Sequence, residues 1–200
     1  MKLVKILVWG GLLSMIASSS LAQPAGATPS GTTQPSGQNS SQSFGHRLGA
    51  AALLSAGADI TYNGAYVGID YPWGDVPATQ GVCTDVVVRA YAQIGVDLQS
   101  RVHADMKQHF DAYPARWGLT RPDRNIDHRR VPNLETFLAR NGEQLSKSTS
   151  ASDYHPGDLV AWMVPKYGGG TTPHIGVVSP HKNARGEPLI VHHLSGRPKL

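Results

Sequence analysis

Residues 81–95 have the sequence GVCTDVVVRAYAQIG. Beyond Cys83, the apolar positions repeat with the helical period of about 3.6 residues, which is typical of a helix that buries one face. These positions are Val86, Val87, Ala90, Tyr91 and Ile94. Gly95 supplies the glycine with which helices commonly end. The segment therefore predicts a buried helix over residues 83–94, with Cys83 in its first turn.

Cys83 is the sole cysteine of the 200-residue chain, so it can form no intramolecular disulfide and belongs to no Cys-based zinc cluster. One interpretation is a small buried hydrophobe, which cysteine often is. Its position favours another. Free backbone N–H groups and the positive end of the helix dipole stabilise a thiolate and lower the thiol pKa from a free value of roughly 8.5. We therefore predict a nucleophile with a lowered pKa.

A thiol nucleophile needs a histidine that accepts and returns a proton, and a group that orients that histidine. His174 precedes an apolar run at 175–178 and is expected at a strand end. His192 and His193 close the next expected strand. Successive strand residues face opposite sides, so only one of the two can share a site with His174. The alternation of side chains does not choose between them.

The rest of the chain predicts an α+β domain with an antiparallel sheet, because helical periods come first and strand-like segments follow. Further helices are expected at residues 44–58, 98–113 and 134–140, and strands at 158–164, 175–179 and 188–193. The dipeptide Asn63-Gly64 predicts the turn of a hairpin between 60–62 and 66–69. Irregular loops are expected at 70–81 and 121–133.

Residues 1–22 have the pattern of a cleaved signal peptide: two lysines, an apolar run over 6–17, and small residues ending at Ala22. A retained membrane anchor is the alternative, but the run is shorter than the roughly 20 residues that span a bilayer. No cysteine near the cleavage site could be acylated. We expect an exported protein, periplasmic or secreted, with no stable membrane insertion after the leader is removed.

Residues 23–43 consist almost entirely of Pro, Gly, Ser, Thr, Gln and Ala, which predicts a flexible linker. Residues 44–200 are then expected to form one folded domain.

The formal net charge of +4 falls to +2 without Lys2 and Lys5 of the leader. This positive charge is too small to predict nucleic-acid binding.

Several motifs resemble those of known families. YPWGDVP at 71–77 and NIDHRRVPN at 125–133 resemble motifs of the YijF-like family of exported bacterial proteins of unknown function, and this resemblance covers nearly all of 58–196. GVCTD at 81–85, PGDLV at 156–160 and PHIGVV at 173–178 resemble the papain-like cell-wall cysteine peptidases of the NlpC type.

The second resemblance implies a papain-like (NlpC-type) core, with a nucleophile helix packed on the antiparallel sheet. It implies that Cys83 is the nucleophile, that His174 is the general base and acid, and that His192 orients the imidazole. His193 stands where the family commonly has asparagine, so the choice between the two histidines stays open. Relatives continue with further sheet-forming sequence, which predicts a chain truncated at its C-terminus.

The nucleophile motif departs from the NlpC pattern Asp-Cys-Ser, since it reads Val82-Cys83-Thr84, so details of substrate recognition do not transfer. We expect substrate contacts from two loops and from the first turn of the cysteine helix. The candidate substrate-binding residues are Tyr71, Asp75, Asp85, Asp127, His128, Arg129 and Arg130.

Each group of these candidates has a structural alternative. The arginines are suited to bidentate hydrogen bonds with substrate carboxylates. The same loop could instead be braced by an internal network of ion pairs. Asp85 could simply be a first-turn acid favoured by the helix dipole.

These expectations converge on an exported cysteine amidase or endopeptidase that hydrolyses amides in peptidoglycan stem or cross-link peptides, without cofactor or metal. The alternatives are a papain-like module that binds cell-wall peptides without turnover, and an acyltransferase that uses the same acyl-enzyme. A metal site is a further rival, although no H-E-x-x-H pattern supports it. Its candidate ligands are His155, His174, His181, His192 and His193. The sequence identifies no protein partner.

Overall fold

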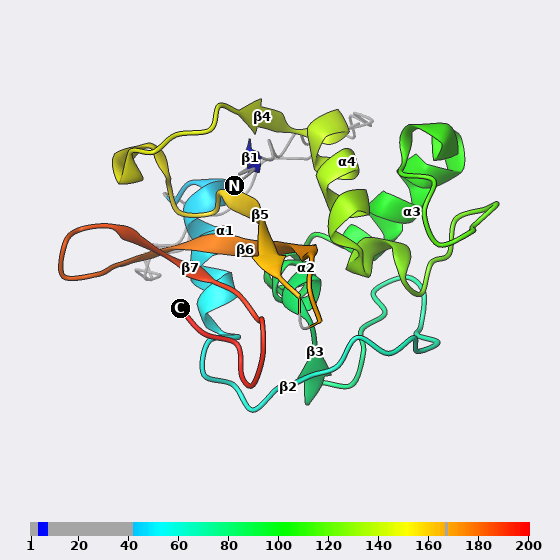
Figure 1. Cartoon of the computed structure of the whole chain (residues 1–200), viewed down its shortest axis with the longest axis horizontal. Coiled ribbons are helices and arrows are strands. Elements are labelled where there is room, and N and C mark those ends of the chain that lie inside the picture. Colours follow the sequence, from blue (N-terminus) through cyan, green and yellow to red (C-terminus); the bar gives the residue numbers. More distant parts are fainter. Residues whose placement is uncertain (1–3, 8–41, 167) are drawn as a thin grey trace, which may run out of the picture.

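The computed structural model describes residues 4–7, 42–166 and 168–200, which form helices packed beside an antiparallel sheet (Figure 1). The helices are α1 (Phe44–Leu53), α2 (Cys83–Gln93), α3 (Leu98–Gln108) and α4 (Val131–Asn141). Short 3-10 helices span Phe110–Ala112, Asp127–Arg129 and Ala151–Asp153.

The larger sheet has the strand order β4-β1-β5-β6-β7, and each neighbouring pair is antiparallel. Its strands are β1 (Val4–Leu7), β4 (Glu143–Leu145), β5 (Leu159–Pro165), β6 (Thr171–Lys182) and β7 (Pro188–Val191). A small parallel pair joins β2 (Thr61–Tyr62) and β3 (Gln80–Gly81). The expected α+β class with an antiparallel sheet is confirmed.

The core lies where α1 and α2 pack against each other and against β6. Figure 1 shows α3 and α4 beyond α2, on the side away from the β6–β7 hairpin. Each valine or leucine side chain that is fully buried in this core stabilises the fold by about 1.5–3 kcal/mol. Residues with no exposed surface include Ala52, Val87, Tyr91, Val102, Leu134, Leu138, Val177 and Val191.

Helix α2 forms as the sequence predicts. At its start, Asp85 Oδ2 accepts a hydrogen bond of 2.6 Å from the backbone N–H of Val82, which satisfies a group that a helix N-terminus would otherwise leave unpaired. At its end, Gly95 takes a left-handed φ of 82°, a conformation that glycine adopts without steric cost. Cys83 is therefore held at the first position of a helix whose two ends are both fixed.

The β5–β6 hairpin corrects the expected position of His174. Strand β6 begins at Thr171, so His174 lies inside the strand, opposite Trp162, and not at its end. Gly176 permits the close approach of β7, because a Cβ there would lie 2.8 Å from the carbonyl oxygen of Val191. The absence of a side chain at this position lets the strand after His174 run tightly beside the segment that carries His192.

The hairpin predicted around Asn63-Gly64 is wrong. Thr61 and Tyr62 pair in parallel with Gln80 and Gly81, across a long intervening loop. The Asn63 side chain instead donates to the side chain of Gln80 and accepts from the backbone N–H of Ala65. Asn63 therefore ends one strand and ties it to its distant partner.

Other boundaries shift for local reasons. The first helix ends at Leu53, several residues before Gly57. The long helix expected over 98–113 is α3 followed by the separate 3-10 helix Phe110–Ala112. Helix α4 begins at Val131, ahead of the expected start, since Pro132 is compatible with a first helical turn.

Most of the expected leader and linker lies outside the described residues. Within 1–22, residues Val4–Leu7 are described, as strand β1 between β4 and β5. From 23–43, residues 42 and 43 are described, and Ser43 caps α1 by accepting a hydrogen bond from the backbone N–H of His46. Across the described residues, no helix is both long enough and apolar enough to cross a membrane.

Cleavage after Ala22 would remove strand β1 from the sheet. Whether residues 1–22 are removed can be tested by mass. When the full chain is expressed in a bacterium with an intact export pathway, we expect an intact mass that corresponds to a protein beginning at Gln23. The Ala22→Arg variant, with a bulky charge where a signal peptidase requires a small residue, should keep the unprocessed mass. A wild-type protein that retains residues 1–22 would contradict the prediction.

Candidate active site

The site is built around Cys83, which lies at the start of α2 and is 5% exposed. Burial raises the pKa of its thiol to about 11. The backbone N–H of Ile175 and the first N–H groups of α2 act in the opposite direction, but the negative charge of Asp85 adds to the rise. The expected lowering of the pKa is therefore wrong, because desolvation outweighs the helix terminus. At neutral pH the resting thiol is protonated.

His174 and His192 are brought together by the pairing of β6 with β7. His174 Nε2 lies 3.0 Å from His192 Nδ1, a hydrogen bond between the two rings. Burial lowers the pKa of His174 to about 4, and the charges that His192 and His193 would carry act in the same direction. Burial also lowers the pKa of His192, helped by Lys199. Both imidazoles are therefore neutral at pH 7.

Trp162 completes this cluster from the neighbouring strand β5. Its ring meets His174 edge to face, with centroids 4.6 Å apart, and meets His192 in the same way at 5.6 Å. Such contacts restrict how either imidazole can rotate. The indole thus restricts both rings. It lies opposite His174 because of the register in which β5 pairs with β6.

His193 faces a different environment. Its Nε2 lies 2.9 Å from the carbonyl oxygen of Gly196, which can only accept, so Nε2 carries the proton. Its ring contacts Tyr62 edge to face, and its Nδ1 is buried without a partner among the described residues. Of the two candidates that the sequence left open, His192 is the one that touches His174.

Cys83 and the histidine pair both lie where the start of α2 packs against β6, but among the described residues no hydrogen bond joins Cys83 to either ring. Cys83 lies against Ile175, the residue after His174. His174 Nε2 already faces His192. His174 Nδ1 is the ring nitrogen left for any exchange of a proton with the thiol.

A hollow of about 600 Å³ opens at the N-terminus of α2. Its walls come from β2 and the segment after it, from residues 116 and 117, from the end of the 3-10 helix Asp127–Arg129 and the start of α4, and from the first residues of β6. Three arginines line it, and no aspartate or glutamate does. The lining residues that later arguments use are Tyr62, Cys83, Arg116, Trp117, Arg129 and Arg130.

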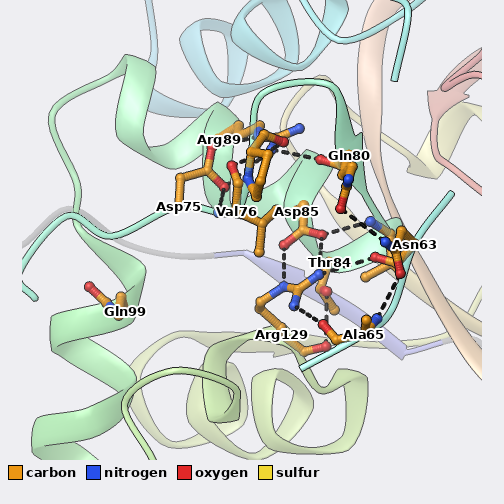
Figure 2. Close-up of polar contacts among 12 residues, drawn as sticks. Asn63, Ala65, Asp75, Val76, Gln80, Thr84, Asp85, Arg89, Gln99 and Arg129 are labelled. Atoms are coloured by element: carbon orange, nitrogen blue, oxygen red, sulfur yellow. Dashed lines mark hydrogen bonds and ion pairs between the residues drawn. The ribbon is translucent and has the colours of Figure 1, made fainter. Parts of the chain in front are cut away.

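Arg129, which is part of the lining, forms a buried ion pair with Asp85 (Figure 2). Arg129 Nε lies 2.8 Å from Asp85 Oδ1, and Nη2 lies 3.0 Å from Oδ2, a bidentate arrangement between side chains that are 2% and 3% exposed. Arg129 also donates to the carbonyl oxygens of Asn63 and Ala65, and its own carbonyl accepts from Thr84 Oγ1. The pair therefore joins the helix that bears Cys83 to two loops.

The remaining candidates in the 125–133 loop are also largely internal. Asp127 is buried, accepts from the backbone N–H of Asp123, and forms an ion pair of 3.1 Å with Arg130. Burial raises the pKa of Asp127, which these two contacts partly offset. His128 is buried as well, and burial lowers its pKa to about 4. Of the four loop candidates, Arg129 and Arg130 line the hollow.

Tyr71 and Asp75 lie apart from the hollow. Asp75 forms a partly exposed ion pair with Arg89, on a later turn of α2 (Figure 2). Tyr71 meets His103 edge to face, and the guanidinium of Arg124 lies over its ring. The structure does not bring these two residues together with Cys83.

Sequence reasoning missed four residues of this region: Tyr62, Arg116, Trp117 and Trp162. Trp162 could have been found by pairing the two predicted strands, since it lies directly across from His174. Tyr62 lies in a predicted strand, 60–62, but no local signal marked it as a site residue, and Arg116 and Trp117 come from a segment without periodicity. Within the described part of the chain, no group of three or more His, Cys, Asp or Glu side chains is placed to hold a metal ion.

The Asp85–Arg129 pair gives a stability prediction. Asp85→Asn leaves a buried guanidinium without its counter-charge, so we expect the free energy of unfolding to fall by about 3–5 kcal/mol in urea titrations. Asp75→Asn is the matched control, because its pair with Arg89 is partly exposed and should contribute about 1 kcal/mol or less. Similar losses in both variants would contradict the structural role of Arg129.

The raised thiol pKa gives a reactivity prediction. In the folded protein, alkylation of Cys83 by iodoacetamide at pH 7 should be at least about tenfold slower than in the urea-unfolded chain, because the thiolate is the reacting species. The folded rate should still be rising at pH 10. A rate that levels off below pH 8 would show that Cys83 carries a preformed thiolate.

The part of the chain that contains the site is similar to known proteins. The chain is 47% identical over 143 residues to "Uncharacterized protein YijF" of Escherichia coli (strain K12), a match that spans 72% of this chain and 68% of that protein. No solved structure matches the chain significantly. The YijF-like resemblance is confirmed, whereas the NlpC-type resemblance stays a prediction. Residues 49–200, which include Cys83, His174 and His192, match a known family model, and the chain therefore belongs to the family described as Domain of unknown function (DUF1287).

Proposed function

We propose that this protein is an exported cysteine hydrolase with a papain-like core, and that it cleaves amide bonds in peptidoglycan stem or cross-link peptides. The observation that carries the proposal is the hydrogen bond of 3.0 Å between His174 Nε2 and His192 Nδ1, beside the helix start that bears Cys83. A nucleophile, a base and a group that orients the base are the three parts that covalent amide hydrolysis requires.

The pKa values decide how the first step proceeds. Because burial keeps the Cys83 thiol protonated and His174 neutral, no preformed ion pair is available at pH 7. The proton must leave Sγ for His174 Nδ1 as Sγ bonds to the substrate carbonyl carbon. For Nδ1 to accept, His174 Nε2 must carry the other proton and donate it to His192 Nδ1. His192 thereby selects the tautomer that acts as a base.

The remaining steps balance without a further reactant. The carbonyl oxygen becomes an oxyanion, which the backbone N–H of Cys83 at the start of α2 can stabilise. The carbon–nitrogen bond then breaks, and the leaving amine takes the proton from His174. Water attacks the thioester and gives one of its protons to His174, which returns it to Sγ as the thioester bond breaks. The products are a carboxylic acid, an amine and the original thiol.

The charge of the hollow supports the choice of substrate. Its lining carries arginines and no acidic side chain, which suits peptides that bear carboxylates. Peptidoglycan stem peptides are such peptides, and an exported enzyme would meet them. Bound peptide would also exclude water from Cys83, which strengthens the electrostatic interactions within the site.

A binding module without turnover is the second candidate, and three observations on Cys83 favour it. The thiol is buried, its pKa is raised, and no hydrogen bond joins it to His174 among the described residues. Such a site could recognise cell-wall peptides without attacking them. An acyltransferase differs from the hydrolase only in the second half-reaction, where an amine replaces water.

Mass spectrometry of purified peptidoglycan after incubation with the mature protein tests the hydrolase. We expect pairs of new fragments whose combined mass exceeds that of the uncleaved parent by one water, because water is added across one amide. Cys83→Ala and His174→Ala should yield none, while their thermal unfolding shows that they remain folded. Retention of the peptides by wild type, with no fragments from it, would replace the hydrolase with the binding module.

His192 and His193 form a matched pair for the orienting role. His192→Ala should lower kcat by about 100-fold or more, because His174 loses the partner that fixes its tautomer. His192→Asn should recover part of this loss, since its side-chain oxygen can accept the same hydrogen bond. His193→Ala should change kcat little, because this ring does not touch His174. A larger loss in His193→Ala than in His192→Ala would reverse the assignment.

A further inference from the structure

One wall of the hollow is formed by residues that the hydrolytic steps do not use. Arg116, Trp117 and Arg130 line it together with Cys83. The same three residues also line a smaller hollow of about 160 Å³, so they form a partition between the two spaces. Neither the cysteine nor the histidine pair needs these side chains, which leaves their arrangement to be explained.

The three arginines of the hollow differ in how far their charge is already neutralised. Arg129 is fully engaged with Asp85 and two backbone carbonyls. Arg130 shares one side with Asp127, through a single contact of 3.1 Å. Arg116 makes no ion pair with any described residue, although its charge opposes the rise that burial causes in the pKa of half-buried Glu135. Positive charge is therefore available at Arg116 and, in part, at Arg130.

Trp117 has an unfavourable backbone conformation in this wall. Its φ is 62°, in the left-handed region that bulky residues rarely adopt. Its large side chain is 48% exposed. The Arg130 guanidinium lies over the indole ring, 4.1 Å from its centroid. This stacking orients the guanidinium plane, and the part of its edge that is not bonded to Asp127 can donate hydrogen bonds.

We propose that Arg116 and Arg130, with the Trp117 indole as a platform, form a carboxylate-binding subsite that selects peptides with a free carboxylate near the amide presented to Cys83. The inference deepens the proposed function and rests on it for the identity of the substrate. Two guanidinium groups on one wall, without an opposing acid in the lining, would pair with a carboxylate more strongly than with a neutral amide of the same shape.

The test measures binding, so it does not depend on turnover. Isothermal titration of full-length Cys83→Ala would compare the stem tripeptide L-Ala-γ-D-Glu-L-Lys with the same tripeptide whose carboxylates are converted to amides. We expect the free carboxylate form to bind at least about tenfold more tightly. Arg116→Gln should remove most of this preference, and Arg130→Lys should weaken it, because lysine keeps the charge but loses the fork and the stacking.

Arg185→Gln is the matched control, since Arg185 is an exposed arginine paired with Glu187 in the turn between β6 and β7. It should leave the preference unchanged. Equal affinity for the two tripeptides, or a preference that survives Arg116→Gln in a folded protein, would overturn the subsite. A preference that depends on Arg116, in a protein that yields no peptidoglycan fragments, would retain the subsite and reject the hydrolase. Cleavage of the carboxylate and amide forms with equal kcat/KM would retain the hydrolase and reject the subsite.

Discussion

The buried ion pair between Asp85 and Arg129 is the interaction on which the site depends. A pair of this kind is not required for stability in itself, because well-packed apolar residues can replace it, but losing one partner leaves the other charge buried. Here the pair has a geometric consequence. Asp85 also accepts the backbone N–H of Val82, and Arg129 also binds two loop carbonyls. The helix start, and with it Cys83, is therefore fixed relative to the walls of the hollow.

Burial is the second constraint, and it acts on the chemistry as well as on the fold. The position that gives Cys83 the N–H groups of a helix terminus also removes it from water, and the second effect is larger. His174 is subject to the same conflict, because the cluster that orients its ring also disfavours its charged form. Both groups are thus stored in neutral form. In the proposed hydrolysis, proton transfer would therefore have to accompany bond formation.

The sequence predicts the elements with strong periodicity and fails where long-range pairing decides. Helix α2, the part of β6 that follows His174, and β7, which ends just before His192, follow from their apolar patterns, and so does the antiparallel sheet. Asn63-Gly64 misleads, because Asn63 is bonded to Gln80, a partner that local turn preferences cannot reveal. The choice of His192 over His193 needed the register of β7 on β6, and the raised pKa of Cys83 needed the depth of its burial.

The doublet Arg129-Arg130 shows why the two interpretations of the 121–133 loop need not exclude each other. The residues adjoin at the end of a single 3-10 helix, so their side chains leave the backbone in different directions. Arg129 extends to Asp85 and braces the fold, whereas Arg130 extends to Asp127 and Trp117 at the wall of the hollow. An internal network and a positively charged surface are therefore built from neighbouring positions. Because Asp85 neutralises Arg129 completely, the charge that a ligand would meet comes from the other two arginines of the hollow.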